Sequence, residues 1–170
     1  MTAATSTLSI ALCPEADNAS EFDRITARQN ATMVVLTAPT STQDRPVAVI
    51  ENRWIVADSS AHFGRMKAAI STCVGKTWTA ASGQQETWAS MTGLPKIGDG
   101  SISFLATAKV ATKSGEVERY LPTTVARFAN LAVMLQGLDD HDVGKAPTLT
   151  IGQLSTIFTE AATKIEHIAT

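Results

Sequence analysis

Residues 102–136 decide the fold class of this chain, and they read ISFLATAKVATKSGEVERYLPTTVARFANLAVMLQ. The apolar residues of the first third occupy every second position: Ile102, Phe104, Ala106, Ala108 and Val110. This alternation is typical of a β-strand with one buried face. Residues 113–115 supply a turn, after which 116–136 continue in extended form. The pattern predicts a long antiparallel meander that is broken near Pro122 and bent near Asn130.

Further strands are predicted upstream of this meander. Residues 33–38 and 47–57 are rich in Val, Ile and other residues that favour strands. Residues 76–81 and 86–91 flank the turn pair Ser82-Gly83 and predict a hairpin that carries Trp78 and Trp88. Both tryptophans are typical of a protein core.

Two stretches with helical spacing of apolar residues predict helices. The first follows the N-cap candidates 58–60, carries the stripe Phe63, Met66, Ile70 and Cys73, and stops at Gly75. We expect His62 to face solvent in its first turn. The second begins at a capping box, Thr150-Ile151-Gly152-Gln153, and its apolar stripe extends to Ile168.

These elements predict an α+β fold, with a single antiparallel sheet and helices covering one of its faces. No repeat, low-complexity tract or linker divides the 170 residues, so we expect one domain over 1–170. Residues 1–7 are expected to form a frayed tail, and Pro14–Asn30 a short solvated helical segment. The stretch Gly137–Pro147 is expected to be a loop.

The composition excludes several classes of protein. Hydrophobic residues make up 44% and charged residues 18%, which is too apolar for a disordered chain. No apolar run approaches about 18 residues, so no transmembrane segment is predicted in this chain. Fourteen Lys and Arg against 16 Asp and Glu give a net charge of −2, which disfavours a nucleic-acid partner. We expect a monomer.

Cys13 and Cys73 are the two cysteines of the chain, and they form either one disulfide or two buried thiols. We favour the disulfide, which would indicate an oxidising compartment. The first twelve residues contain no Lys or Arg and do not resemble an export signal. The expectation is an extracellular or cell-envelope protein whose leader or lipid anchor is replaced by Met1, with a cytoplasmic location as the alternative.

Familiar catalytic and metal-binding motifs are absent from the sequence, and no cofactor or metal is predicted. Asp58 and His62 are four residues apart beside Ser59 and Ser60, so they could form a hydrolytic triad. The favoured interpretation is that Asp58 caps a helix. The run 139–142, Asp-Asp-His-Asp, could hold Ca²⁺ but lacks the usual loop pattern, which favours a solvated acidic loop.

The run Trp54-Ile55-Val56-Ala57-Asp58-Ser59-Ser60-Ala61 leads through Phe63, Met66 and Ile70 to Cys73, Gly75 and Trp78. This stretch resembles the sensor domain of the actinobacterial receptor kinase PknH and of related lipoproteins. The later strands at 124–135 and the helix at 154–168 agree with that family as a pattern. The resemblance implies an exported domain in which a sheet and helices surround a cleft. In the family an upstream Cys, here Cys13, bridges to the Cys at the helix end.

The resemblance also implies ligand binding rather than catalysis, with a small-molecule or cell-wall ligand. The family's kinase sensor has a second disulfide in its late strands, and this chain has no Cys after Cys73, so it resembles a stand-alone lipoprotein. The candidate ligand-binding residues are Trp88, Tyr120, Arg127 and Asn130. An arginine within an apolar strand either reaches solvent at an edge or faces a cavity, where it would bind an anionic group. The alternatives are a small secreted hydrolase using Asp58 and His62, and a cell-envelope interaction domain.

Overall fold

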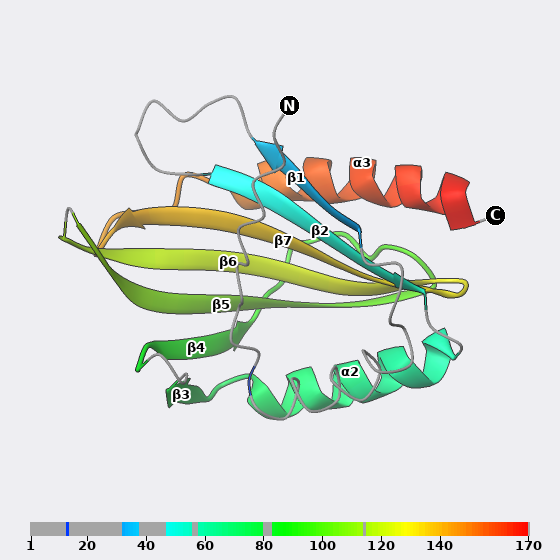
Figure 1. Ribbon diagram of the computed structural model, residues 1–170, viewed down its shortest axis with the longest axis horizontal. Coiled ribbons are helices and arrows are strands. Elements are labelled where there is room, and N and C mark those ends of the chain that lie inside the picture. The colour runs from blue at the N-terminus through cyan, green and yellow to red at the C-terminus, as the bar shows by residue number, and fades with distance from the viewer. Residues whose placement is uncertain are drawn as a thin grey trace.

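A seven-stranded antiparallel sheet forms the centre of the protein, in the order β1-β2-β7-β6-β5-β4-β3 (Figure 1). The computed structural model describes residues 13, 32–37, 47–55, 58–79, 83–113 and 115–169. The strands are β1 (Thr32–Thr37), β2 (Val47–Ile55), β3 (Thr77–Thr79), β4 (Gln85–Ser90), β5 (Gly100–Thr112), β6 (Gly115–Phe128) and β7 (Leu131–Asp142), and the helices are α2 (Ser59–Cys73) and α3 (Ile151–Ala169). The predicted α+β fold is therefore confirmed. The tail and the helical segment expected within residues 1–30 lie outside the described residues.

Strands β5 to β7 form the predicted meander, and β4 extends it, because each of these strands pairs with the next one along the chain. The predicted break near Pro122 is wrong, since β6 runs through this residue without interruption. Proline has no N–H group to donate, so only the β6–β7 pairing is affected. That pairing skips Leu121 and Pro122 and keeps the same register on both sides. The expected bend near Asn130 is a complete reversal, in which residues 129–130 form the turn into β7.

Strand β7 replaces much of the loop that was expected over Gly137–Pro147, because it continues to Asp142. Gly137 lies within this continuation, opposite Pro122 and beneath α3. A Cβ at Gly137 would lie 2.8 Å from Pro122 Cγ and 2.9 Å from Leu154 Cδ2. The missing side chain therefore lets the proline ring of β6 and the first turn of α3 both contact β7.

Helices α2 and α3 pack on opposite faces of the sheet, which corrects the expectation that the helices cover one face (Figure 1). Successive residues of a strand point to opposite faces, and in β7 Met134 packs with α2 whereas Leu135 packs with α3. The α2 side of the core includes Met66, Ile70, Cys73, Trp88, Phe104, Leu121 and Val125, and the α3 side includes Val133, Leu149, Leu154, Phe158, Ala161 and Ile165. A central strand covered on both faces needs apolar residues at every position, as residues 131–135 show.

Both helices begin where the capping patterns predict. Asp58 is the N-cap of α2, and its Oδ1 accepts a hydrogen bond from the Ala61 N–H at 2.9 Å. At α3 the Gln153 N–H donates to Thr150 Oγ1 at 3.3 Å, and the Thr150 N–H donates to Gln153 Oε1 at 3.0 Å. The expectation that His62 faces solvent is wrong, because His62 is only 6% exposed. The first turn of α2 already lies close to the sheet.

The predicted hairpin is formed by β3 and β4, and it places aromatic rings beneath α2. Trp88 is fully buried and stacks on Phe104 with ring centroids 4.1 Å apart. Trp78 meets Trp88 edge-on at 5.0 Å. Helix α2 ends against the same strands, where the Gly75 N–H donates to the Trp88 carbonyl at 2.7 Å. The hairpin and the helix end therefore share one part of the core.

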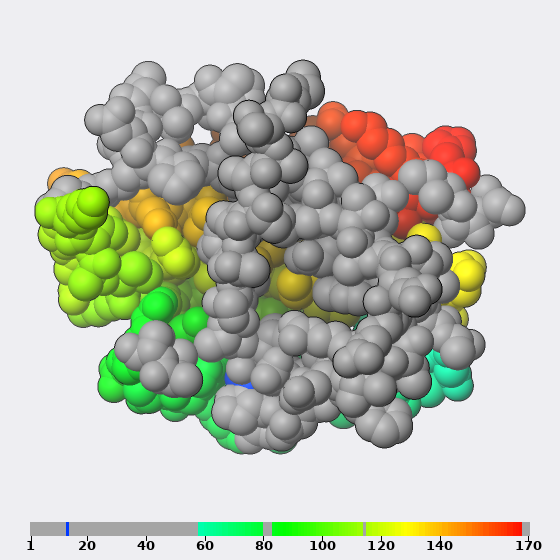
Figure 2. All heavy atoms as spheres, in the orientation of Figure 1, coloured from blue at the N-terminus to red at the C-terminus, as the bar shows by residue number. Residues whose placement is uncertain are grey.

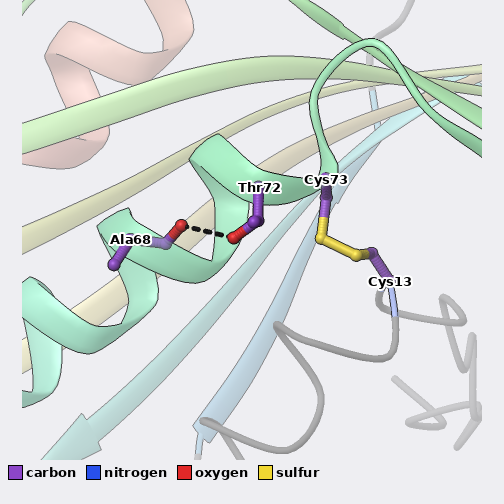
Figure 3. Close-up of a disulfide and its surroundings, with 4 residues drawn as sticks. All are labelled: Cys13, Ala68, Thr72 and Cys73. Atoms are coloured by element: carbon purple, nitrogen blue, oxygen red, sulfur yellow. Dashed lines mark hydrogen bonds between the residues drawn. A yellow bond between two sulfur atoms is a disulfide. The ribbon is translucent and has the colours of Figure 1, made fainter.

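A disulfide joins Cys13 to Cys73 in the last turn of α2, as favoured from the sequence (Figure 3). The two Cα atoms are 6.1 Å apart, and the cysteines are separated by 60 residues in the sequence. Both cysteines are buried. In the same turn the Thr72 hydroxyl donates to the Ala68 carbonyl at 2.8 Å. The bond therefore fastens residue 13 to the α2 side of the core.

Candidate functional site

The four residues predicted to bind a ligand lie at three separate places. Trp88 belongs to the core beneath α2. Tyr120 and Arg127 are an odd number of positions apart in β6, so their side chains point to opposite faces of the sheet. Asn130 is exposed in the turn between β6 and β7. The structure brings Arg127 and Asn130 to the same end of the sheet and does not assemble all four residues into one site.

Arg127 belongs to a group of residues that we call the turn junction: Ser59, Asp99, Arg127 and Ala129. The Asp99 N–H donates to the Arg127 carbonyl at 2.8 Å, and Asp99 Oδ2 accepts from the Ala129 N–H at 2.9 Å. Arg127 Nη2 lies 3.9 Å from the same carboxylate oxygen. The Ser59 hydroxyl donates to the Ala129 carbonyl. These bonds hold Ala129 at a φ of 47°, a left-handed conformation that favours glycine.

Asp58 and His62, the alternative hydrolytic pair, lie in and before the first turn of α2. The Asp58 carboxylate caps the helix, and the hydroxyl of the neighbouring Ser59 donates to the backbone of the β6–β7 turn. The Asp58 carboxylate and the Ser59 hydroxyl therefore both make hydrogen bonds that stabilise the start of α2. Hydrolysis by this pair stays a prediction.

The run from Asp139 to Asp142 lies at the end of β7, which corrects the expectation of a solvated acidic loop. Asp139, Asp140 and His141 are 0%, 8% and 6% exposed. Because side chains alternate along a strand, Asp139 and His141 share the α3 face with Leu135, whereas Asp140 lies on the α2 face. The same short stretch thus contributes buried polar groups to both faces of the sheet.

The α3-face cluster consists of Glu118, Tyr120, Asp139 and His141. Asp139 Oδ2 accepts from the Leu149 N–H at 2.7 Å. His141 lies between two carboxylates, with Nδ1 3.9 Å from Asp139 Oδ1 and Nε2 3.9 Å from Glu118 Oε2. Asp139 Oδ1 and His141 Nδ1 are buried and have no hydrogen-bond partner in the part of the chain that the structure describes. Burial and, secondly, the charge of Asp139 raise the pKa of Tyr120.

The α3-face cluster borders an uncovered part of the sheet. Helix α3 packs mainly on β6 and β7, whereas the side chains on the same face of β3, β4 and β5 are exposed or half-buried, and we call this face the open face. Its central row crosses five adjacent strands, with each residue directly opposite the next: Thr77, Thr87, Thr107, Tyr120 and Asp139. The first two threonines are exposed, and their hydroxyls are 2.8 Å apart. A row of hydroxyl groups thus leads across the open face to a buried carboxylate.

The α2-face cluster lies on the other side of the same strands and consists of Trp78, Glu86, Trp88, Arg119 and Asp140. Arg119 donates from Nε and Nη2 to the two Asp140 carboxylate oxygens, at 2.7 Å each. Glu86 lies in the same cross-strand row as this pair and is 5% exposed. Within the described residues, Glu86 Oε2 and the two indole N–H groups are buried without hydrogen-bond partners. This cluster is therefore part of the core, and its Arg119–Asp140 pair joins β6 to β7.

Burial raises the pKa of Glu86. The indole N–H of the neighbouring Trp88 and the positive charge of Arg119 favour the ionised carboxylate and therefore oppose the shift. A carboxyl whose pKa is higher in the folded than in the unfolded state binds more protons when folded, so its contribution to stability falls as the pH rises above about 4.5. We predict that Glu86→Gln raises the free energy of unfolding at pH 7 and that the difference from the wild type closes at pH 4. Urea unfolding at both pH values measures this. A variant less stable than the wild type at pH 7 would contradict it.

Three charged residues of these clusters, Glu86, Glu118 and Arg119, were not predicted from the sequence as site residues. A signal was present, because the run Glu116-Val117-Glu118-Arg119 places charges on both faces of a predicted strand. Which strands lie beside those charges depends on the pairing register. That register, rather than the residue types, brings Arg119 to Asp140 and Glu118 to His141.

The described residues contain neither a metal-binding group of side chains nor a helix that could span a membrane. In this part of the chain, no group of three or more His, Cys, Asp and Glu side chains is arranged to hold a metal ion. Neither α2 nor α3 combines the length and the apolar character that crossing a membrane requires.

In the orientation of Figure 2, the joined ends of β5 and β6 and the outer surface of α3 are exposed at opposite ends of the molecule. Tyr120 lies near the first of these ends, in the half of β6 that follows the turn from β5. The resemblance to PknH-like sensor domains is an expectation from the sequence of residues 54–78. Comparisons with protein-family models, with curated proteins and with solved structures each give no match to this chain.

Proposed function

We propose that this protein is an exported ligand-binding domain without catalytic activity, similar in role to the PknH-like sensor domains, and that its ligand docks on the open face beside the α3-face cluster. The observation that carries this proposal is that the buried atoms Asp139 Oδ1 and His141 Nδ1 have no hydrogen-bond partner among the described residues. An unpaired buried polar group costs about 1–3 kcal/mol. A ligand that supplied the missing hydrogen bonds would recover this free energy.

Tyr120 controls the approach to these atoms. It lies between Thr107 and Asp139 in the central row and is only half-buried. A rotation of the Tyr120 side chain would connect the open face to the Asp139 carboxylate. The cleft expected from the family resemblance would then be formed between the open face and the segment before α3, where Leu149 contacts Asp139.

Export is supported by the Cys13–Cys73 disulfide, because such bonds persist in oxidising compartments. The protein would then act outside the cell or in the cell envelope.

A docking surface for an envelope protein would expose a contiguous apolar patch. Among the described residues the exposed large hydrophobic side chains are Val143 and Ile151, each 44% exposed, which favours a polar ligand over such a partner.

Native mass spectrometry tests the proposal. The protein is incubated with the small-molecule fraction of its source medium, and the bound mass is measured for the wild type, Tyr120→Ala and a control, Thr163→Val, whose hydroxyl is exposed on α3 and donates to Thr159. We expect a bound molecule on the wild type and the control but not on Tyr120→Ala. No bound molecule, or one that survives Tyr120→Ala, contradicts the proposal. A molecule recovered in chemically altered form would instead support the enzyme alternative.

A further inference from the structure

The side chains of the open face have a distinct chemistry. Besides the central row, the exposed residues on this face of β3 to β5 are Thr79, Gln85, Ala89, Lys109 and Ala111, and the half-buried ones are Ser101, Ser103 and Leu105. Hydroxyl and amide groups both donate and accept hydrogen bonds. Lys109 lies 3.9 Å from Glu116, so its charge is balanced on the surface. The open face is therefore largely polar and close to neutral, with Ala89, Leu105 and Ala111 as its apolar side chains and with hydrogen-bonding groups that can serve as donors or acceptors.

This chemistry excludes several classes of ligand at the open face. A nucleic acid or another polyanion needs several unpaired cations, and the described part of this face has only the balanced Lys109. A lipid or an apolar peptide needs a contiguous apolar surface, whereas the exposed large hydrophobic residues, Val143 and Ile151, lie outside β3 to β5. A neutral ligand with many hydroxyl groups needs neither unpaired cations nor a contiguous apolar surface, so it fits the open face.

We infer that the ligand is a neutral saccharide that lies across the strands along the central row; this inference rests on the proposed function. Adjacent strands are about 4.8 Å apart, so Thr77, Thr87, Thr107 and Tyr120 follow one another at regular intervals from strand to strand, and the hydroxyls of the first two bond to each other at 2.8 Å. An oligosaccharide carries hydroxyl groups on every ring and can follow such a series. Asp139 Oδ1, which has no hydrogen-bond partner among the described residues, would accept from a saccharide hydroxyl. The Tyr120 ring supplies an apolar surface for one sugar ring.

Isothermal titration calorimetry tests the inference on the full chain. The probes are tetrasaccharides of glucose, mannose, arabinose and N-acetylglucosamine, with a polyethylene glycol of similar size as the control ligand because it carries hydroxyl donors only at its two ends. We expect at least one tetrasaccharide to bind and the glycol not to bind. Thr107→Val and Tyr120→Phe each remove one hydroxyl and keep the shape of the side chain. Each is expected to weaken binding about three- to tenfold, while Thr163→Val leaves it unchanged.

The outcomes separate the inference from the proposed function. Absence of binding to every tetrasaccharide overturns the saccharide inference, and so does binding that Thr107→Val and Tyr120→Phe leave unchanged. If the mass measurement still finds a bound molecule that Tyr120→Ala removes, the proposed function stands and only the ligand class was wrong. If that measurement also fails, both fall. Urea unfolding of the two variants shows that weaker binding does not come from loss of folding.

Discussion

Removing the disulfide between Cys13 and Cys73 is expected to lower the free energy of unfolding by about 4 kcal/mol. The bond closes a loop between residues 60 positions apart, and the chain-entropy model gives this value for a loop of that length. Native domains are stable by only about 5–15 kcal/mol, so the loss is a large part of the total. The bond restricts the unfolded chain and, in the folded state, holds residue 13 against α2.

Urea unfolding with and without a reducing agent measures this effect. Reduction should shift the midpoint of the wild type to lower urea, whereas the double variant Cys13→Ala/Cys73→Ala should show the lower midpoint under both conditions. Limited proteolysis of the reduced protein should cleave within residues 1–30 before the sheet opens, because local stability follows local burial. Two titratable thiols in air-oxidised native protein would contradict the bond and would support the cytoplasmic alternative.

Arg119→Met is expected to lower the free energy of unfolding by about 2–4 kcal/mol. The guanidinium of Arg119 donates two hydrogen bonds to Asp140, whose side chain is only 9% exposed, and Glu86 lies in the same row. Removing one partner of a buried ion pair leaves an uncompensated buried charge, which costs about 3–5 kcal/mol. We expect a smaller loss because the Arg119 side chain is 25% exposed and water reaches part of the pair.

A double-mutant cycle tests the physical reason for this loss. If the cost comes from the stranded Asp140 carboxylate, the variant Arg119→Met/Asp140→Leu should recover most of the stability, because replacing both partners with apolar residues is often close to neutral. Lys109→Met is the control, since Lys109 and Glu116 lie 3.9 Å apart with side chains 64% and 57% exposed. This surface pair should contribute less than about 1 kcal/mol. An Arg119→Met variant as stable as the control would contradict the prediction.

Some elements of the fold followed directly from local patterns. The period of two in residues 102–110 identified β5, and the apolar residues at helical spacing identified α2. The caps at Asp58 and Thr150 marked where the helices begin. Such signals lie within a few residues of one another, so no knowledge of the rest of the chain is needed to interpret them.

The candidate site was predicted only in part. Tyr120 was identified as a polar aromatic residue in a late strand, but its neighbours Asp139 and His141 were assigned to a solvated loop. Acidic residues together usually indicate a loop, because buried carboxylates are costly without partners. Here the partners come from the segment before α3 and from the neighbouring strand β6, at Leu149 and Glu118. These contacts join residues that the local pattern does not connect.

Local pattern was sufficient for the fold class, the helices and most strands, and the presence of only two cysteines favoured the Cys13–Cys73 bond. Tertiary structure alone decided that α2 and α3 lie on opposite faces, that β6 continues through Pro122, and that β7 extends to Asp142. The physical reason is that propensity and periodicity act between residues close in the chain. Which side of a sheet a helix covers, and which charges can be buried together, depend on strand pairing between distant segments. In this protein that pairing places the row from Thr77 to Asp139 on one face.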